Sequence, residues 1–173
     1  MCEEGPCTLG HVVSYCRVIL ENDVFDTPKR RHETVLATFI KNVFLNLGDI
    51  QYNCDLHGLH LPFLSSNIRP DLVIINGKQM LICELSCPME EYNDVRHSEK
   101  TSKYQILLNE LTTQGLTPSV FAVEVGARGV VSRNTFDLLA ALGINSGKSK
   151  QIADELTKVA LLCSYKFYLN RDN

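Results

Sequence analysis

The spacing of apolar positions along the chain predicts five helices. In each of them apolar residues recur every three or four positions, which gives the helix one apolar face. Gly48 is expected to end the second helix. The polar stretch at 23–30, which holds Pro28, is expected to be a link, and residues 51–67 are expected to be irregular. The predicted helices are Thr8–Asn22, Arg31–Leu47, Asp94–Gln114, Thr135–Leu142 and Ser149–Asn170.

Apolar runs also predict three strands. Asp71–Ile75 and Gln79–Leu85 lie on either side of Asn76-Gly77, a dipeptide typical of a tight β-hairpin turn. A third run, Ser119–Val125, predicts a buried strand that ends in the turn Gly126–Gly129. Because these strands are interspersed with helices, we expect an α/β (α+β) domain in which helices flank a mixed central sheet.

The composition indicates one compact domain. The chain has 173 residues, of which 45% are hydrophobic and 21% charged, and this composition excludes a disordered or collagen-like protein. No apolar run is long enough to cross a bilayer, so no membrane partner is expected. The N-terminus does not resemble a secretory signal. The seven cysteines are therefore expected to be reduced thiols or metal ligands rather than disulfides.

The net charge of −3 argues mildly against a protein that coats nucleic acid non-specifically. The charge is uneven, however. Residues 126–173 hold seven Lys/Arg and four Asp/Glu, a local charge of +3, whereas residues 1–125 hold ten and sixteen, a charge of −6. A divalent cation bound by some of these acids would offset part of the negative charge. The sequence therefore remains compatible with nucleic-acid binding, but not with tight coating by this domain alone.

Two acids at the predicted hairpin are candidate metal ligands. Asp71 opens its first strand and Glu84 closes the second, so both carboxylates are expected at the same end of the strand pair. Carboxylates are hard oxygen ligands for Mg²⁺, and a nearby lysine can stabilise charge that develops on a phosphodiester. Lys100 and Lys103 share a face of the next predicted helix. Taken alone, this pattern also fits solvated strand ends and a basic helix surface.

The ordered series Arg69-Pro70-Asp71, Glu84-Leu85-Ser86 and Lys100-x-x-Lys103-Tyr104 resembles the PD-(D/E)XK nuclease superfamily. Within it, the chain is most similar to the restriction-like endonuclease domain that follows the reverse transcriptase in site-specific non-LTR retrotransposons. In that domain the core lysine lies on the helix after the strand, which is consistent with Ser86 at the usual lysine position. The resemblance covers roughly residues 8 to 168. It includes Arg31-His32 and the segment from Val125 to Gly143, and it implies a restriction-endonuclease-like core.

The resemblance implies roles for individual residues. Asp71 and Glu84 would bind Mg²⁺ or Mn²⁺, and Lys100, or alternatively Lys103, would be the catalytic lysine. Glu33 is the candidate for a third metal-binding acid, although an acid in the first turn of a helix also complements the helix dipole. Arg128 lies in a turn that could bind phosphate or simply connect a strand to a helix. The expected DNA-phosphate contacts are Lys29, Arg30, Arg31, Arg96, Lys103 and Arg128.

The N-terminal cysteines suggest a second metal. Retrotransposons of this kind carry a zinc knuckle just before the nuclease, and Cys2, Cys7, His11 and Cys16 supply a partial match. Three thiolates and one imidazole suit tetrahedral Zn²⁺. The alternative is a truncated knuckle in which Cys16 packs as a small apolar residue. We expect a zinc-knuckle-like segment and helix over 1–22, packed on the core, and the nuclease domain over 23–173.

The expected function is that of a metal-dependent endonuclease. It would nick or cleave target DNA by hydrolysis of a phosphodiester bond, so that the free 3′-hydroxyl primes reverse transcription in retrotransposition. The alternative is a weak or inactive nuclease-fold module that binds nucleic acid or a protein partner. Expected partners are target DNA, RNA as a second option, and the rest of a retrotransposon polyprotein. By analogy with the family, the expected location is the nucleus.

Overall fold

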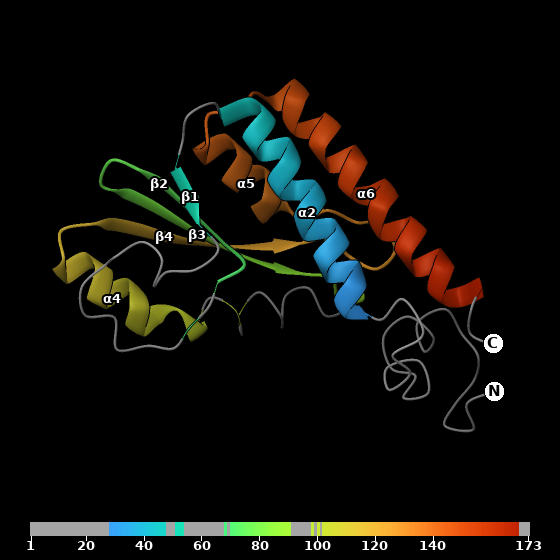
Figure 1. Ribbon diagram of the computed structural model, residues 1–173, viewed down its shortest axis with the longest axis horizontal. Coiled ribbons are helices and arrows are strands. Elements are labelled where there is room, and N and C mark those ends of the chain that lie inside the picture. The colour runs from blue at the N-terminus through green and yellow to red at the C-terminus, as the bar shows by residue number, and fades with distance from the viewer. Residues whose placement is uncertain are drawn as a thin grey trace.

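The computed structural model describes residues 28–47, 51–53, 68, 70–90, 98, 100 and 102–169. Helices and strands are interspersed along these residues (Figure 1). In chain order they are α2 (Pro28–Leu47), β1 (Gln51–Asn53), β2 (Leu72–Asn76), β3 (Gln79–Ser86), α4 (Gln105–Thr113), β4 (Thr117–Glu124), α5 (Arg133–Ala141) and α6 (Ser146–Leu169).

The four strands form one mixed sheet in the order β1-β2-β3-β4. β1 is antiparallel to β2, β2 is antiparallel to β3, and β3 is parallel to β4. The β2–β3 hairpin pairs Asn76 with Gln79 and turns at Gly77, whose φ of 59° is readily adopted only by glycine. The predicted hairpin and the predicted mixed α+β architecture are therefore confirmed.

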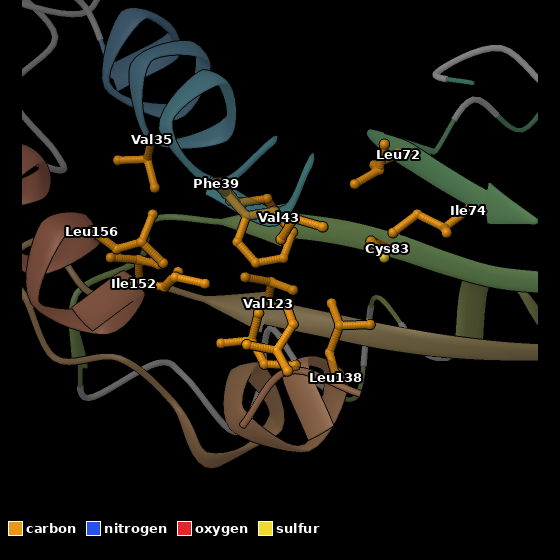
Figure 2. Packing of buried hydrophobic residues seen from close by; sticks show 14 of the residues in the cluster. Val35, Phe39, Val43, Leu72, Ile74, Cys83, Val123, Leu138, Ile152 and Leu156 are labelled. Carbon is orange, nitrogen blue, oxygen red and sulfur yellow. The ribbon is translucent and has the colours of Figure 1, made fainter. Parts of the chain in front are cut away.

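Helices cover both faces of the sheet. α2, α5 and α6 lie on one face and α4 on the other (Figure 1). The larger core lies under the three helices, where Phe39 of α2 and Leu138 of α5 pack with Ile74 of β2 (Figure 2). On the other face, Leu107 and Leu111 of α4 pack with Val73, Met80 and Ile82. β2 and β3 are buried on both sides over most of their length, which explains their continuous runs of apolar residues.

Several element boundaries differ from those expected. α2 begins at Pro28 rather than Arg31, because proline is well suited to the first helical position, where its missing N–H is not needed. α6 begins at Ser146 rather than Ser149, because the Asn145 side chain accepts a hydrogen bond from the Lys148 amide (3.0 Å) and caps the helix. β1 lies at the start of residues 51–67, which were expected to be irregular.

The long helix expected over Asp94–Gln114 is interrupted at Tyr104. Residues 98, 100, 102 and 103 are helical, Tyr104 is a turn with φ −91° and ψ −4°, and α4 then runs from Gln105 to Thr113. The predicted helix over 8–22 and the zinc-knuckle-like segment lie outside the described residues. No helix in the described part of the chain is long and apolar enough to cross a membrane.

Candidate active site

The two acids lie at the same end of the β2–β3 pair. In the antiparallel register Leu72 faces Cys83, so Asp71, just before β2, and Glu84, just after Cys83, occupy neighbouring positions at this end. Residues facing each other on antiparallel strands have Cβ atoms about 5 Å apart. The hairpin register expected from the sequence thus places the two carboxylate-bearing residues next to each other, as a shared metal site would require.

Glu84 is buried, with 4% of its side chain exposed, and both of its carboxylate oxygens are hydrogen-bonded. Oε1 accepts hydrogen bonds from Nζ of Lys100 (2.5 Å) and of Lys103 (3.2 Å). Oε2 accepts one from the Tyr104 hydroxyl (2.5 Å). Burying a carboxylate is costly unless it has charged or hydrogen-bonding partners, and Glu84 has three. Lys100 and Lys103 therefore both contact Glu84, whereas their spacing indicated only that they share a helix face from which either could reach the carboxylates.

Tyr104 connects the core under α4 to the acidic residues. Its side chain is fully buried among the residues of that core, while its hydroxyl reaches Glu84. Burial and the hydrogen bond to Glu84 raise the pKa of Tyr104 far above its usual value, so the hydroxyl stays protonated and remains a donor. The sequence singled out Tyr104 only as an apolar helix position and as the last residue of the Lys-x-x-Lys-Tyr series, not as a functional group.

Asp71 is fixed by a different helix. Its Oδ2 accepts hydrogen bonds from the Leu85 backbone N–H (2.7 Å) and from Nε2 of His32 in α2 (3.2 Å). The hydrogen bond to Asp71 raises the pKa of His32 against the effect of burial. Burial acts to raise the pKa of Asp71, but the hydrogen bonds from His32 and Leu85 outweigh it, and the net shift is downward. The two side chains therefore form an ion pair at mildly acidic pH.

The site includes a residue that the sequence analysis did not propose. His32 was noted only as part of the resemblance at the start of its helix, and no spacing rule connects it to Asp71, 39 residues later. Lys100 connects Glu84 to the Asp71–His32 pair. It donates a hydrogen bond to Glu84, and its positive charge contributes to the lowered pKa of Asp71. The same charge acts to lower the pKa of His32, but the hydrogen bond to Asp71 has the larger, opposite effect. His32, Asp71, Glu84, Lys100 and Tyr104 thus form one electrostatic unit.

The donor set is chemically suited to a hard divalent cation. Asp71 and Glu84 supply carboxylate oxygens. The hydroxyl of Ser86, two residues after Glu84, is buried and makes no hydrogen bond to any residue that the structure describes. A metal-bound water at this end of the sheet would satisfy such a hydroxyl. The described residues include no group of three or more His, Cys, Asp or Glu side chains placed to hold a metal. Glu33 is exposed at the start of α2 and is not part of such a group.

Arg31 does not have the position expected of a phosphate contact. Only 2% of the residue is exposed, and its guanidinium donates hydrogen bonds to the Cys87 carbonyl (2.8 Å) and to Oγ of Ser164 (3.3 Å). It also lies 5.6 Å from the centre of the Phe167 ring, and burial lowers its pKa. The prediction is corrected: Arg31 joins α2 to α6 in the interior, and such a group cannot reach a DNA backbone in this conformation.

The other predicted phosphate contacts differ in their surroundings. Arg128 is 47% exposed, and its Nε donates a hydrogen bond to Glu90 (2.7 Å), which also accepts one from the Arg128 amide (2.8 Å). Lys103 is 44% exposed although it contacts Glu84. Arg30 is exposed on the first turn of α2. Arg96, the side chain of Lys29 and the proposed zinc ligands Cys2, Cys7, His11 and Cys16 lie outside what the structure describes.

No protein-family model matches the chain, and a search of curated proteins finds no match either.

Proposed function

We propose that this chain is a metal-dependent DNA endonuclease domain with a restriction-endonuclease-like core. The observation that carries the proposal is the position of Lys100. Its ammonium group contacts Glu84 and acts electrostatically on Asp71, so two acids and one lysine occupy a single sheet end although the strand itself carries Ser86 instead of lysine. Two acids and a lysine at one sheet end are what the PD-(D/E)XK resemblance requires.

Each residue of the site has a distinct role in this proposal. Asp71 and Glu84 would hold Mg²⁺ or Mn²⁺, and the bound cation would polarise the phosphate and lower the pKa of the attacking water. Lys100 would stabilise the charge that builds up on the phosphate oxygens. Lys103 is the more exposed of the two lysines (44% against 28%) and would contact the phosphate next to the cleaved one.

Two further side chains would act as positioning residues. His32 fixes Oδ2 of Asp71 from α2, and Tyr104 fixes Oε2 of Glu84 from the opposite face of the sheet. Buried partners of this kind hold a carboxylate in one orientation, which matters because metal binding tolerates little displacement of its ligands. In the same proposal, the product is a nicked DNA whose 3′-hydroxyl primes reverse transcription, in the nucleus, with the rest of a retrotransposon polyprotein as partner.

A plasmid-nicking assay tests the proposal. Supercoiled DNA is incubated with the full chain in Mg²⁺ or Mn²⁺, with and without EDTA, and the same measurement is made on Asp71→Asn and Lys100→Met. Asp71→Asn keeps the shape of the side chain and its acceptor for the Leu85 amide. We expect nicking by the wild type that EDTA abolishes, and a loss of at least about 100-fold in each variant, as is usual for a catalytic group.

Matched controls come from α5 and α6. Asp137→Asn and Lys158→Met remove the same charges at exposed positions away from the site, and both should nick at the wild-type rate. Undiminished nicking by Asp71→Asn, with the variant shown to be folded, would refute the assignment.

One observation favours the alternative, a nuclease-fold module that binds nucleic acid without cutting it. Both oxygens of Glu84 are already occupied by Lys100, Lys103 and Tyr104, and the charges of the two acids and two lysines cancel. A gel-shift measurement with duplex DNA and with RNA, run beside the nicking assay, separates the two functions. Binding without metal-dependent nicking would favour the alternative.

A further inference from the structure

An apolar stripe lies on the outer surface of α6. Four large side chains in its last three turns are exposed, from 44% for Leu161 to 59% for Leu162 and Tyr165, with Leu169 at 54%. At about 100° per residue these positions fall within an arc of about 100° on the helix. Ala160, Ser164 and Phe167, which are buried, lie on a different face. A contiguous apolar surface of this kind usually marks a contact with another element.

The chain enters the described fold beside this stripe. Arg31, in the first turn of α2, reaches Ser164 and the Phe167 ring, which places the start of α2 against the last turns of α6. Figure 1 shows these two helix ends side by side. Pro28, where the description of the chain begins, therefore lies near the last turns of α6, which carry the stripe.

The sequence of residues 1–27 complements the stripe in apolar pattern and in charge. In the predicted helix over 8–22, the positions Val12, Cys16 and Ile19 lie on one face with three more apolar residues, within an arc of about 120°. Residues 1–27 hold five acids and one arginine, a charge of −4. On α6, the exposed Lys158 and Lys166 border the stripe. The six apolar positions are Leu9, Val12, Val13, Cys16, Ile19 and Leu20.

We propose that residues 8–22 dock on α6 as an amphipathic helix whose apolar face covers Leu161, Leu162, Tyr165 and Leu169. The connecting residues 23–27 can extend to about 17 Å, which allows the chain to turn back from Pro28 along α6. Because the two surfaces belong to one chain, a short linker gives them a high effective concentration. The proposal does not depend on nuclease activity, and its test does not involve DNA.

A single tryptophan provides the test, because the natural chain contains none. Tyr165→Trp is made in the full chain, and its fluorescence and iodide quenching are compared with those of Leu45→Trp, a position on α2 that is 72% exposed. We expect a blue-shifted, weakly quenched indole at position 165 and a red-shifted, strongly quenched one at position 45. Circular dichroism confirms that each variant is folded.

A second substitution then identifies the occupant. Ile19→Lys, added to Tyr165→Trp, places a charge on the apolar face of the predicted helix and should expose the indole. Val18→Lys, on its opposite face, is the matched control and should leave the indole shielded. An indole at position 165 that is quenched as strongly as the one at position 45 would overturn the proposal. Shielding that survives Ile19→Lys and weakens on dilution would overturn it as well, in favour of a second copy of the chain.

Discussion

Tyr104→Phe removes one atom from the candidate site and tests whether Glu84 depends on its buried partner. The ring remains in the core under α4, so the loss is confined to the hydroxyl and its 2.5 Å hydrogen bond to Oε2. Glu84 is only 4% exposed, so water cannot readily replace the donor. A hydrogen bond to a charged group contributes about 1.5–3 kcal/mol, and we expect the free energy of unfolding to fall by that amount. In a domain of this size the melting temperature should fall by roughly 3–12 °C.

Urea unfolding followed by circular dichroism measures the change. Thr112→Val is the matched control. It also removes a hydroxyl, but from an exposed position on α4, where the hydroxyl donates a hydrogen bond to the Leu108 carbonyl one turn earlier (2.7 Å). Surface changes of this kind stay within about 0.5 kcal/mol. If the unfolding free energy of Tyr104→Phe lies within about 0.5 kcal/mol of the wild-type value, Glu84 does not depend on the Tyr104 hydroxyl.

Two further predictions concern α2. His32→Gln should destabilise the protein most between about pH 3.8 and 6.5. Because the pKa of His32 is raised in the folded protein, its contribution to stability is lost as the pH rises through that pKa. Because the pKa of Asp71 is lowered, its contribution is lost as the pH falls through that pKa. Urea unfolding of both proteins from pH 3 to 9 checks this, and a difference that grows above pH 8 would contradict it. Arg31→Met should lower the unfolding free energy by about 1–3 kcal/mol, because the Cys87 carbonyl loses its partner, whereas Arg30→Met at the exposed neighbouring position should change it by less than about 0.5 kcal/mol. Equal effects of the two arginine substitutions in urea would show that Arg31 is not a buried link.

Local sequence signals were sufficient for the β2–β3 hairpin and for the meeting of the two acids. Asn76-Gly77 fixes the turn, the turn fixes the register, and the register places Asp71 opposite Glu84. Periodicity also gave the approximate extents of α2, α5 and α6. It could not reveal the interruption at Tyr104, because that residue has the apolar spacing of the helix and differs only in the contact that its hydroxyl makes.

The errors concerned long-range contacts. Arg31 and Arg30 are adjacent, and both were expected to contact phosphate, yet one is buried against α6 and the other is exposed. Neighbouring positions on a helix point about 100° apart, so the difference depends on which face meets α6. His32 was missed for the same reason. Its partner Asp71 is distant in sequence, and only the packing of α2 on the sheet brings them together.

The acids of the candidate site depend on both layers of helices. His32 holds Asp71 from the α2 side, and Tyr104 holds Glu84 from the α4 side, so the geometry of the sheet end follows from the packing of two separate cores. With Lys100 and Lys103 on Glu84, the site is already electrically balanced. Lys100 and Lys103 both donate to Oε1, whereas Tyr104 is the donor to Oε2. A divalent cation that binds Oε1 would therefore have to displace at least one ammonium group, because each carboxylate oxygen has two lone pairs. Lys103 is the more exposed of the two lysines and lies farther from Oε1, so its departure breaks the weaker contact. In the endonuclease that we propose, Lys100 would then remain in place to act on the phosphate.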